Sequence, residues 1–229
     1  MSLSVRFVDN HLLAVEKPAC LPVVPDESGD ESLFDRAREW VEVEYQKPGR
    51  AFLGVVHRLD RPVSGVVLFA RTSKAASRLT DQFRERTVEK TYLAVCEGRM
   101  AHEVGRMEQW LVKDRGTNRV RAGHDTDEGA KRALTRWKVL ASEGNRHLVE
   151  LVPETGRSHQ LRVALSSLGA PILGDLKYGA RDALADRSIA LHARSLAVDH
   201  PTLRDRRVLA SEVPAGDWWR LAREHLGGE

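Results

Sequence analysis

The residues best suited to chemistry in this chain lie between 57 and 65, where the sequence reads His-Arg-Leu-Asp-Arg-Pro-Val-Ser-Gly. Asp60 stands between Arg58 and Arg61, and a nearby guanidinium favours the ionised form of a carboxylate. Apolar runs on both sides predict strands, so we expect the carboxylate on a loop between two strands, where catalytic groups often lie. An ionised carboxylate held in this way can act as a nucleophile. The alternative is an arginine–aspartate pair that only fixes a surface turn.

Four short segments follow one another along the chain in an order that is hard to produce by chance. They are Lys17-Pro18 with Pro22-Val23-Val24-Pro25, the loop around Asp60, Lys90-Thr91-Tyr92, and Thr-Gly-Arg-Ser-His-Gln-Leu-Arg at 155–162 followed by Gly169–Gly179. The stretch Leu191-His192-Ala193 is a weaker match. In this order the segments resemble the motifs of the RluA-type RNA pseudouridine synthases, and the resemblance covers most of the chain.

The resemblance implies an isomerase that breaks the N-glycosidic bond of a uridine in RNA, turns the uracil and rejoins it through carbon. Such a reaction needs no cofactor. Asp60 would either form a covalent adduct with the ribose or remove a ribose proton, and the sequence leaves both routes open. The resemblance pairs Arg162 with Asp60, where a planar guanidinium can bind both carboxylate oxygens. It assigns Tyr92 to the removal of the C5 proton, and the ring could also stack on the base.

The resemblance also suggests residues that hold the RNA. Arg58 is similar to an arginine that fills the space left by a uridine flipped out of its stack. Arg157, His159 and Gln160 stand near the expected start of a helix, whose free N–H groups favour phosphate. A structural role for His159 is the alternative.

Three further residues complete the expected substrate site. We expect Lys17 to contact the RNA backbone and Leu191 to line the uracil pocket, although loop packing and core packing would explain them as well. Lys90 stands two residues before Tyr92, so both side chains lie on one face of a strand. Two positions depart from the family pattern, with Val63 where threonine is usual and Ala164 where histidine is usual. Neither is assigned to bond making, so they bear on substrate choice.

The charge distribution is consistent with an RNA partner. The net charge is only +3, but residues 71–136 hold 15 lysines and arginines against 10 acidic residues, and residues 1–50 hold 6 against 10. Clustered cations suit a phosphate backbone, although interspersed surface charge is the alternative. The cations in question are Arg115, Arg119, Arg121, Lys131, Arg132 and Arg136. Because the first motif begins within the first twenty residues, we expect no separate N-terminal RNA-binding domain. The catalytic domain would then bind a compact tRNA stem-loop or rRNA hairpin by itself.

Composition bounds the class of protein. Hydrophobic residues make up 41% and charged residues 30%, which is typical of a globular protein. No apolar run is long enough for a membrane span, and two cysteines without metal spacing favour a reduced, cytoplasmic protein. The nine histidines show no metal-binding arrangement, so no metal is expected. A monomer is expected.

The pattern of elements predicts an α+β fold. Short strands dominate, helices are expected from Ser32 to about Gln46, over 73–85 and 158–168, and near the C-terminus, and βαβ alternation is absent. We therefore expect one domain over 1–229, with a mainly antiparallel mixed sheet flanked by helices and loops around an RNA-binding cleft. The polar stretch 113–128 is predicted to be a long hairpin loop or an arm that becomes ordered on binding.

Two other functions remain open from the sequence. An RNA-binding or RNA-folding module without catalysis would have no need of Asp60, Tyr92 and Arg162 together. A carboxylate-dependent glycosidase would need a second acid near Asp60, and the motifs supply none.

Overall fold

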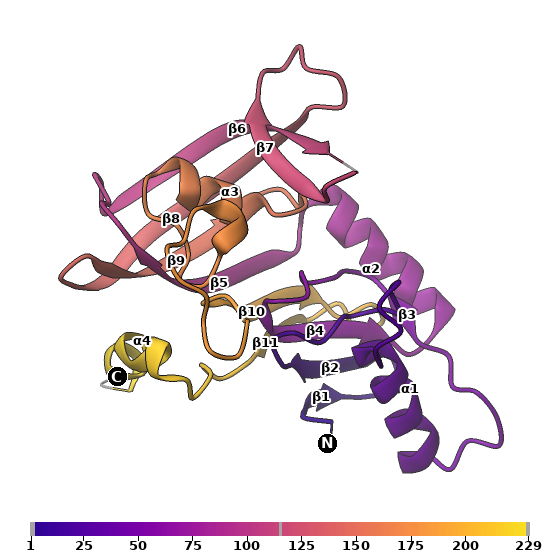
Figure 1. Ribbon diagram of the computed structural model, residues 1–229. Coiled ribbons are helices and arrows are strands. Elements are labelled where there is room, and N and C mark those ends of the chain that lie inside the picture. The colour runs from indigo at the N-terminus through magenta and orange to yellow at the C-terminus, as the bar shows by residue number, and fades with distance from the viewer. Residues whose placement is uncertain (1–2, 115, 228–229) are drawn as a thin grey trace. The chain divides into compact units, whose positions relative to one another are not determined.

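The computed structural model describes residues 3–114 and 116–227, and it has the predicted α+β fold (Figure 1). The chain divides into two compact units, one of Met1–Lys90 with Ala193–Glu212 and one of Thr91–His192 with Val213–Glu229. The chain passes between the units inside strands β5 (Glu89–Glu97) and β10 (Leu191–Asp199). The expectation of a single domain stays a prediction.

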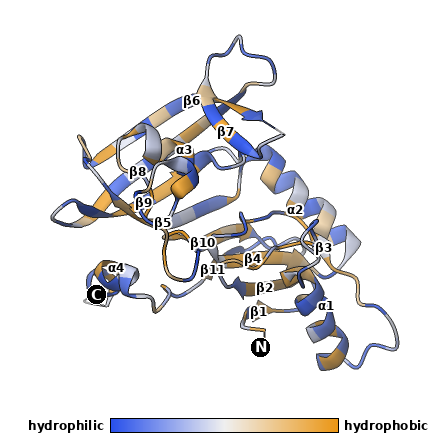
Figure 2. Ribbon diagram, in the orientation of Figure 1, coloured by the Kyte–Doolittle hydropathy of each residue, from blue (hydrophilic) through white to orange (hydrophobic). Residues whose placement is uncertain are grey.

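The first unit contains a sheet with antiparallel pairing in which β4 (Ser64–Ala70) is central. Its other strands are β1 (Val5–Val8), β2 (Leu12–Lys17), β3 (Gly54–Val55), β10 and β11 (Arg206–Ala210). Strand β2 pairs antiparallel with β1 on one side and with β4 on the other. All seven residues of β4 are buried, which is why the strand reads as a continuous apolar run (Figure 2).

Two helices of the first unit begin where the sequence predicts. Helix α1 (Leu33–Glu44) has Ser32 as its N-cap, and the Ser32 hydroxyl accepts a hydrogen bond from the Asp35 N–H at 3.1 Å. Helix α2 (Ser73–Glu85) is capped by Thr72 in the same way. The apolar face of α2 packs through Leu79 on the core that Leu12, Leu68 and Leu196 form. The loop that carries Asp60 therefore leads directly into β4, a strand packed in this core.

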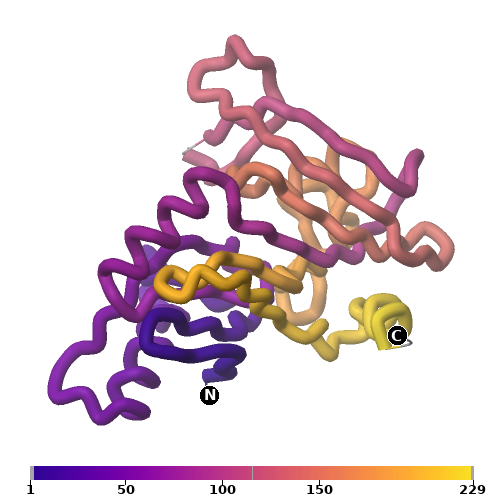
Figure 3. Tube along the Cα trace, turned by 180° about the vertical axis from the view of Figure 1, so that it is seen from behind, coloured from indigo at the N-terminus to yellow at the C-terminus, as the bar shows by residue number. Residues whose placement is uncertain are grey.

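The second unit is built on five antiparallel strands. Their order is β5, β9 (Arg146–Pro153), β8 (Lys131–Glu143), β6 (Val104–Asp114) and β7 (Arg119–Gly123), in which β6–β7 and β8–β9 are hairpins. Helix α3 (Gln160–Ser167) packs on one face, where Val163 joins a core with Leu111, Val120, Ala133 and Tyr178. From behind, β6 and β8 lie in front of α3, so the helix covers a single face of these strands (Figure 3). Two short 3₁₀ turns, η1 (Leu176–Tyr178) and η2 (Asp217–Trp219), and helix α4 (Arg220–Leu226) complete the unit.

Some elements differ from the expectation. Strand β7 lies inside the stretch 113–128 that was predicted to be a loop. The stretch carries alternating charge rather than apolar residues, because β7 is an edge strand with its arginines in solvent. Strands β10 and β11 were not predicted, and β3 has two residues where a strand over 52–56 was expected.

Candidate active site

Asp60 lies on a tight loop between β3 and β4, as predicted. The Val63 N–H donates to the Asp60 carbonyl at 3.0 Å, which closes the turn. Leu59 and Val63, on either side, are 8% and 2% exposed, so both flanks of the loop are anchored in the core while the carboxylate is half-buried. Gly65 has φ of +126°, and a Cβ there would stand 2.4 Å from the Ala193 carbonyl oxygen. Only glycine fits this position, which fixes the path of the loop.

Lys17 anchors this loop through backbone carbonyls. The side chain is fully buried, and its Nζ donates to the carbonyls of Pro18 at 3.0 Å, Leu21 at 2.7 Å and Arg61 at 3.0 Å. Burial lowers the pKa of Lys17 to about 7, against the opposing effects of Cys20 and Asp60. The ammonium thus has three carbonyl partners and ties two loops together. A contact of Lys17 with the RNA backbone stays a prediction.

Arg61 also has a local role. Its guanidinium forms ion pairs with Asp26 and Asp30 and donates to the Ser28 hydroxyl at 2.9 Å. The hydrogen bond from Arg61 lowers the pKa of Asp30. Of the two arginines beside Asp60, Arg61 is thus engaged with the 26–30 loop, while the Arg58 side chain is exposed.

His57 and Lys90 lie in the same unit as Asp60. The Leu68 N–H donates to His57 Nε2 at 2.9 Å, and the imidazole stacks on Phe83 with ring centroids 5.1 Å apart. Burial, followed by the positive charge of Lys90, lowers the pKa of His57 to about 4, so this imidazole is neutral near pH 7. Burial also lowers the pKa of Lys90. His57 is a structural residue of the loop base.

In the second unit, Arg162 makes a buried bidentate ion pair with Asp175. Its Nε donates to Oδ2 at 2.7 Å and its Nη2 to Oδ1 at 2.8 Å, with side chains 7% and 1% exposed. The Arg162 guanidinium carbon also lies 4.8 Å from the centre of the Tyr178 ring. The predicted bidentate geometry is present, but Asp175 occupies it.

Tyr178 connects this pair to its surroundings. Its hydroxyl accepts a hydrogen bond from the Val120 N–H at 2.9 Å and lies 2.6 Å from His159 Nδ1. A hydroxyl that accepts from Val120 can donate to Nδ1, which leaves the histidine proton on Nε2. His159 therefore has a structural partner in this unit, as the alternative for this residue expected.

The side-chain amide of Gln160 is hydrogen-bonded inside the second unit. Its Nε2 donates to the Leu134 carbonyl at 2.8 Å and to the Thr135 hydroxyl at 3.0 Å. Its Oε1 accepts from the Thr155 hydroxyl at 2.7 Å and from the Arg157 N–H at 3.1 Å. These four bonds use the full capacity of a side chain that is 4% exposed. The polar atoms of Gln160 are therefore satisfied inside the unit, and its contact with RNA stays a prediction.

The remaining predicted residues have varied surroundings. Arg157 Nε donates to the Arg132 carbonyl at 3.1 Å, and its side chain is half-buried. Tyr92 is half-buried on β5, opposite Leu151 of β9. Leu191 is 3% exposed, which fits the core role that was its alternative.

The cations of the β6–β8 region are largely paired with carboxylates. Arg121 binds Asp127 at 2.9 Å and Arg132 binds Glu108 at 2.6 Å. Arg136 similarly binds Glu154 at 3.1 Å. The arginine at 115 lies outside the described residues. This surface has interspersed charge with exposed arginine side chains.

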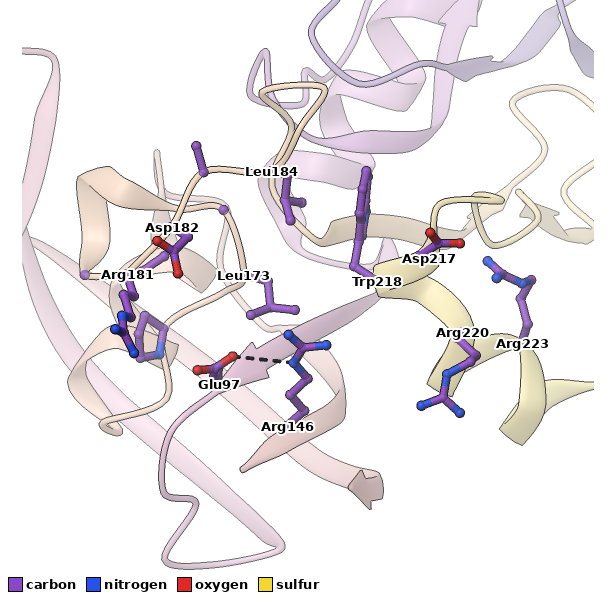
Figure 4. A pocket seen from close by; sticks show the side chains of 15 residues that line it. Glu97, Arg146, Leu173, Arg181, Asp182, Leu184, Asp217, Trp218, Arg220 and Arg223 are labelled. Carbon is purple, nitrogen blue, oxygen red and sulfur yellow. Dashed lines mark hydrogen bonds and ion pairs between the residues drawn. The ribbon is translucent and has the colours of Figure 1, made fainter. Parts of the chain in front are cut away.

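A cavity of about 630 Å³ lies in the second unit (Figure 4). Trp218 faces it, and Arg146, Arg181, Arg220 and Arg223 line it. Three of these cations are engaged locally. Arg146 pairs with Glu97 at 3.5 Å, Arg220 pairs with Glu143 and Glu224, and Arg223 donates to two backbone carbonyls. None of the predicted site residues lines this cavity.

The structure thus separates the candidates by unit. Asp60, Arg58, Lys17 and Lys90 belong to the first unit, and the remaining predicted site residues belong to the second. The convergence of Asp60, Tyr92 and Arg162 on one uridine stays a prediction. Asp175 and Tyr178 were not singled out, although both lie in the motif segment Gly169–Gly179. The available signal was the presence of an acidic and an aromatic residue inside that motif segment.

The profile of the RNA pseudouridylate synthase family matches residues 11–167, which include the Asp60 loop, Tyr92 and the 155–162 segment. The chain belongs to this family. It is accordingly an isomerase that converts uridine in RNA to pseudouridine, and a binding module without catalysis is not favoured.

Individual relatives agree with this assignment. The chain is 37% identical over 201 residues to the dual-specificity RNA pseudouridine synthase RluA of Haemophilus influenzae, covering 87% of this chain and 88% of that protein. It is 33% identical over 210 residues to ribosomal large subunit pseudouridine synthase C of Rickettsia conorii, covering 91% of this chain and 67% of the other. The solved structure of human RNA pseudouridylate synthase domain containing 4 is similar, with a TM-score of 0.78, 25% identity, and coverage of 98% and 93%.

Over 3–114 and 116–227, no three or more histidine, cysteine, aspartate or glutamate side chains are grouped so that they could hold a metal ion. Within the same ranges, no helix combines the length and apolar character that a membrane span requires.

Proposed function

We propose that the protein isomerises uridine in a compact, structured RNA, a tRNA stem-loop or an rRNA hairpin, with Asp60 as the nucleophile. The observation that carries the proposal is the anchored turn that presents the Asp60 carboxylate within the family's matched region. The relative named as a ribosomal large subunit enzyme supports an rRNA target, and the relative named as having dual specificity supports more than one target.

The proposed reaction uses three side chains. The Asp60 carboxylate either bonds to C1′ as the uracil N1 leaves or takes a proton from C2′. The uracil then turns and C5 bonds to C1′. This step breaks the Asp60–C1′ bond on the covalent route, and on the other route the proton returns to C2′. The C5 hydrogen is then lost as a proton beside Tyr92, and N1 takes up a proton. Arg162 is proposed to orient the Asp60 carboxylate and to stabilise charge in the low-dielectric site. No cofactor, metal or net redox change enters this scheme.

RNA binding in this proposal depends on exposed cations. Arg58 is exposed beside Asp60 and is proposed to fill the place of the flipped uridine. Arg157 and the exposed arginines of β7 are proposed to contact phosphates. We further propose that the protein acts as a monomer in the cytoplasm.

The deciding experiment is pseudouridine mapping of total RNA from cells with and without this protein. A site that disappears in the cells without it identifies the substrate. Purified protein should then restore that site in RNA from those cells. If no position changes and the purified protein modifies no uridine, the proposal is wrong.

The role of Asp60 is tested by Asp60→Asn. We expect no pseudouridine formation, while binding of the identified RNA stays within a few fold of wild type, because the amide keeps the shape but not the charge. Asp81→Asn is the matched control, because Asp81 is a surface residue of α2 whose ion pair with Arg84 is exposed. Product formation by Asp60→Asn would rule out Asp60 as the nucleophile.

A further inference from the structure

The second unit holds a buried cluster around Arg162 that the proposed chemistry does not by itself explain. It consists of Arg162, Asp175, Tyr178, His159 and Val120. Breaking a buried ion pair leaves an uncompensated charge, so such a pair constrains its partners strongly. Asp175 comes one residue before η1 and Arg162 lies in the first turn of α3, so the pair joins two elements.

The pairing sets the orientation of the guanidinium plane. Because Asp175 binds Nε and Nη2 together, the guanidinium cannot rotate about its long axis without losing both bonds. The Nη1 edge then points away from Asp175. A single hydrogen bond would allow the guanidinium to rotate, so the two bonds to Asp175 together determine the direction of the Nη1 edge.

Tyr178 fixes the same group from a second direction. Its ring lies against the Arg162 guanidinium, and the hydroxyl is held by the Val120 N–H of β7. The Arg119 guanidinium, exposed on β7, also lies 5.8 Å from the same ring centre. The ring therefore joins the buried arginine to an edge strand that carries exposed cations.

We propose that Asp175 and Tyr178 are positioning residues for Arg162, with Asp175 orienting the guanidinium and Tyr178 coupling that orientation to β7. This rests on the proposed role of Arg162 in the reaction. Asp175 has no role in making or breaking bonds. Its removal should slow the chemical step through Arg162 alone.

The test is a double-mutant cycle of Asp175→Asn and Arg162→Met. The probe is total RNA labelled with tritium at uridine C5, taken from cells that lack the protein, since pseudouridine formation releases this hydrogen. At saturating protein we expect Asp175→Asn to slow single-turnover release by about 10²-fold, the effect of a small misplacement at a reacting group. RNA binding should stay within about threefold. In the Arg162→Met background, Asp175→Asn should cause no further loss.

Tyr178→Phe serves as the second variant, because it keeps the ring and removes only the hydroxyl that Val120 and His159 contact. We expect a smaller loss of rate, about tenfold, in a protein that still folds. Asp182→Asn, an exposed change seven residues along the chain, is the matched control and should have no effect.

The outcomes separate this inference from the proposed function. If Arg162→Met keeps the wild-type rate, the role proposed for Arg162 in the reaction is wrong. If Arg162 is needed but Asp175→Asn and Tyr178→Phe both react at the wild-type rate, the positioning proposal alone is wrong. Equal slowing by Asp175→Asn in both backgrounds also overturns it, because Asp175 would then act independently of Arg162.

Discussion

Replacing Lys17 by methionine tests whether this buried ammonium anchors the Asp60 loop or binds RNA. The change leaves the carbonyls of Pro18, Leu21 and Arg61 without their donor. Each unsatisfied buried acceptor costs about 1–3 kcal/mol. Removing the buried charge of Lys17 offsets part of the cost of the three carbonyls. We therefore expect a loss of about 3 kcal/mol in the free energy of unfolding. For a chain of this size, each kcal/mol shifts the melting temperature by about 2–4 °C, which predicts a fall of about 6–12 °C.

The pH dependence gives the same experiment a second readout. The pKa of Lys17 is about 7 in the folded protein against an ordinary value of 10.5. Between these values the unfolded chain keeps a proton that the folded protein has released, so the stability of the wild type rises with pH. The stability gap between wild type and Lys17→Met should widen above pH 7 by about 1.4 kcal/mol per pH unit.

Thermal melting at pH 7 and pH 9, with RNA binding at several salt concentrations, measures both effects. Lys74→Met is the matched control, because Lys74 is exposed on α2, and it should shift stability by less than about 0.5 kcal/mol. A lysine that contacts a phosphate would behave differently. Its loss would lower the slope of log affinity against log salt by about 0.7–0.9 and leave the melting temperature unchanged. That result would refute the anchoring role.

Three other changes test the packing around the candidate residues. The pKa of His57 is about 4 in the folded protein and ordinarily 6.5, so the free energy of unfolding should fall by up to about 3 kcal/mol as the pH drops from 6.5 to 4. Urea unfolding of His57→Gln should not show this fall. Gly65→Ala forces a methyl against the Ala193 backbone and should cost more than about 3 kcal/mol; a wild-type melting temperature would contradict the reasoning. Gln160→Leu removes four hydrogen bonds and should cost about 2–4 kcal/mol in chemical denaturation, with no change in the salt dependence of RNA binding.

The local sequence predicted most elements because their patterns arise from short-range physics. The N-cap at Ser32 and the apolar spacing of α2 depend on neighbours within a few residues, and both helices formed as expected. Edge strand β7 escaped prediction because its arginines face solvent and Val120 is its one buried residue, which is too little for an apolar pattern. Strand β3 pairs with β4 at only two positions, which the apolar run around it does not reveal.

The sequence by itself determined the family, the chemistry and the loop that carries Asp60, since these depend on residue type and order. The tertiary structure decided which cations are available. Lys17 and Gln160 match binding motifs, yet burial leaves both engaged with backbone and side chains of their own unit. The ion pair of Arg162 with Asp175 was also decided in three dimensions, because the packing of η1 against α3 brings Asp175 to it. Hydrogen-bond partners and burial depend on contacts between distant segments, which residue order alone does not specify.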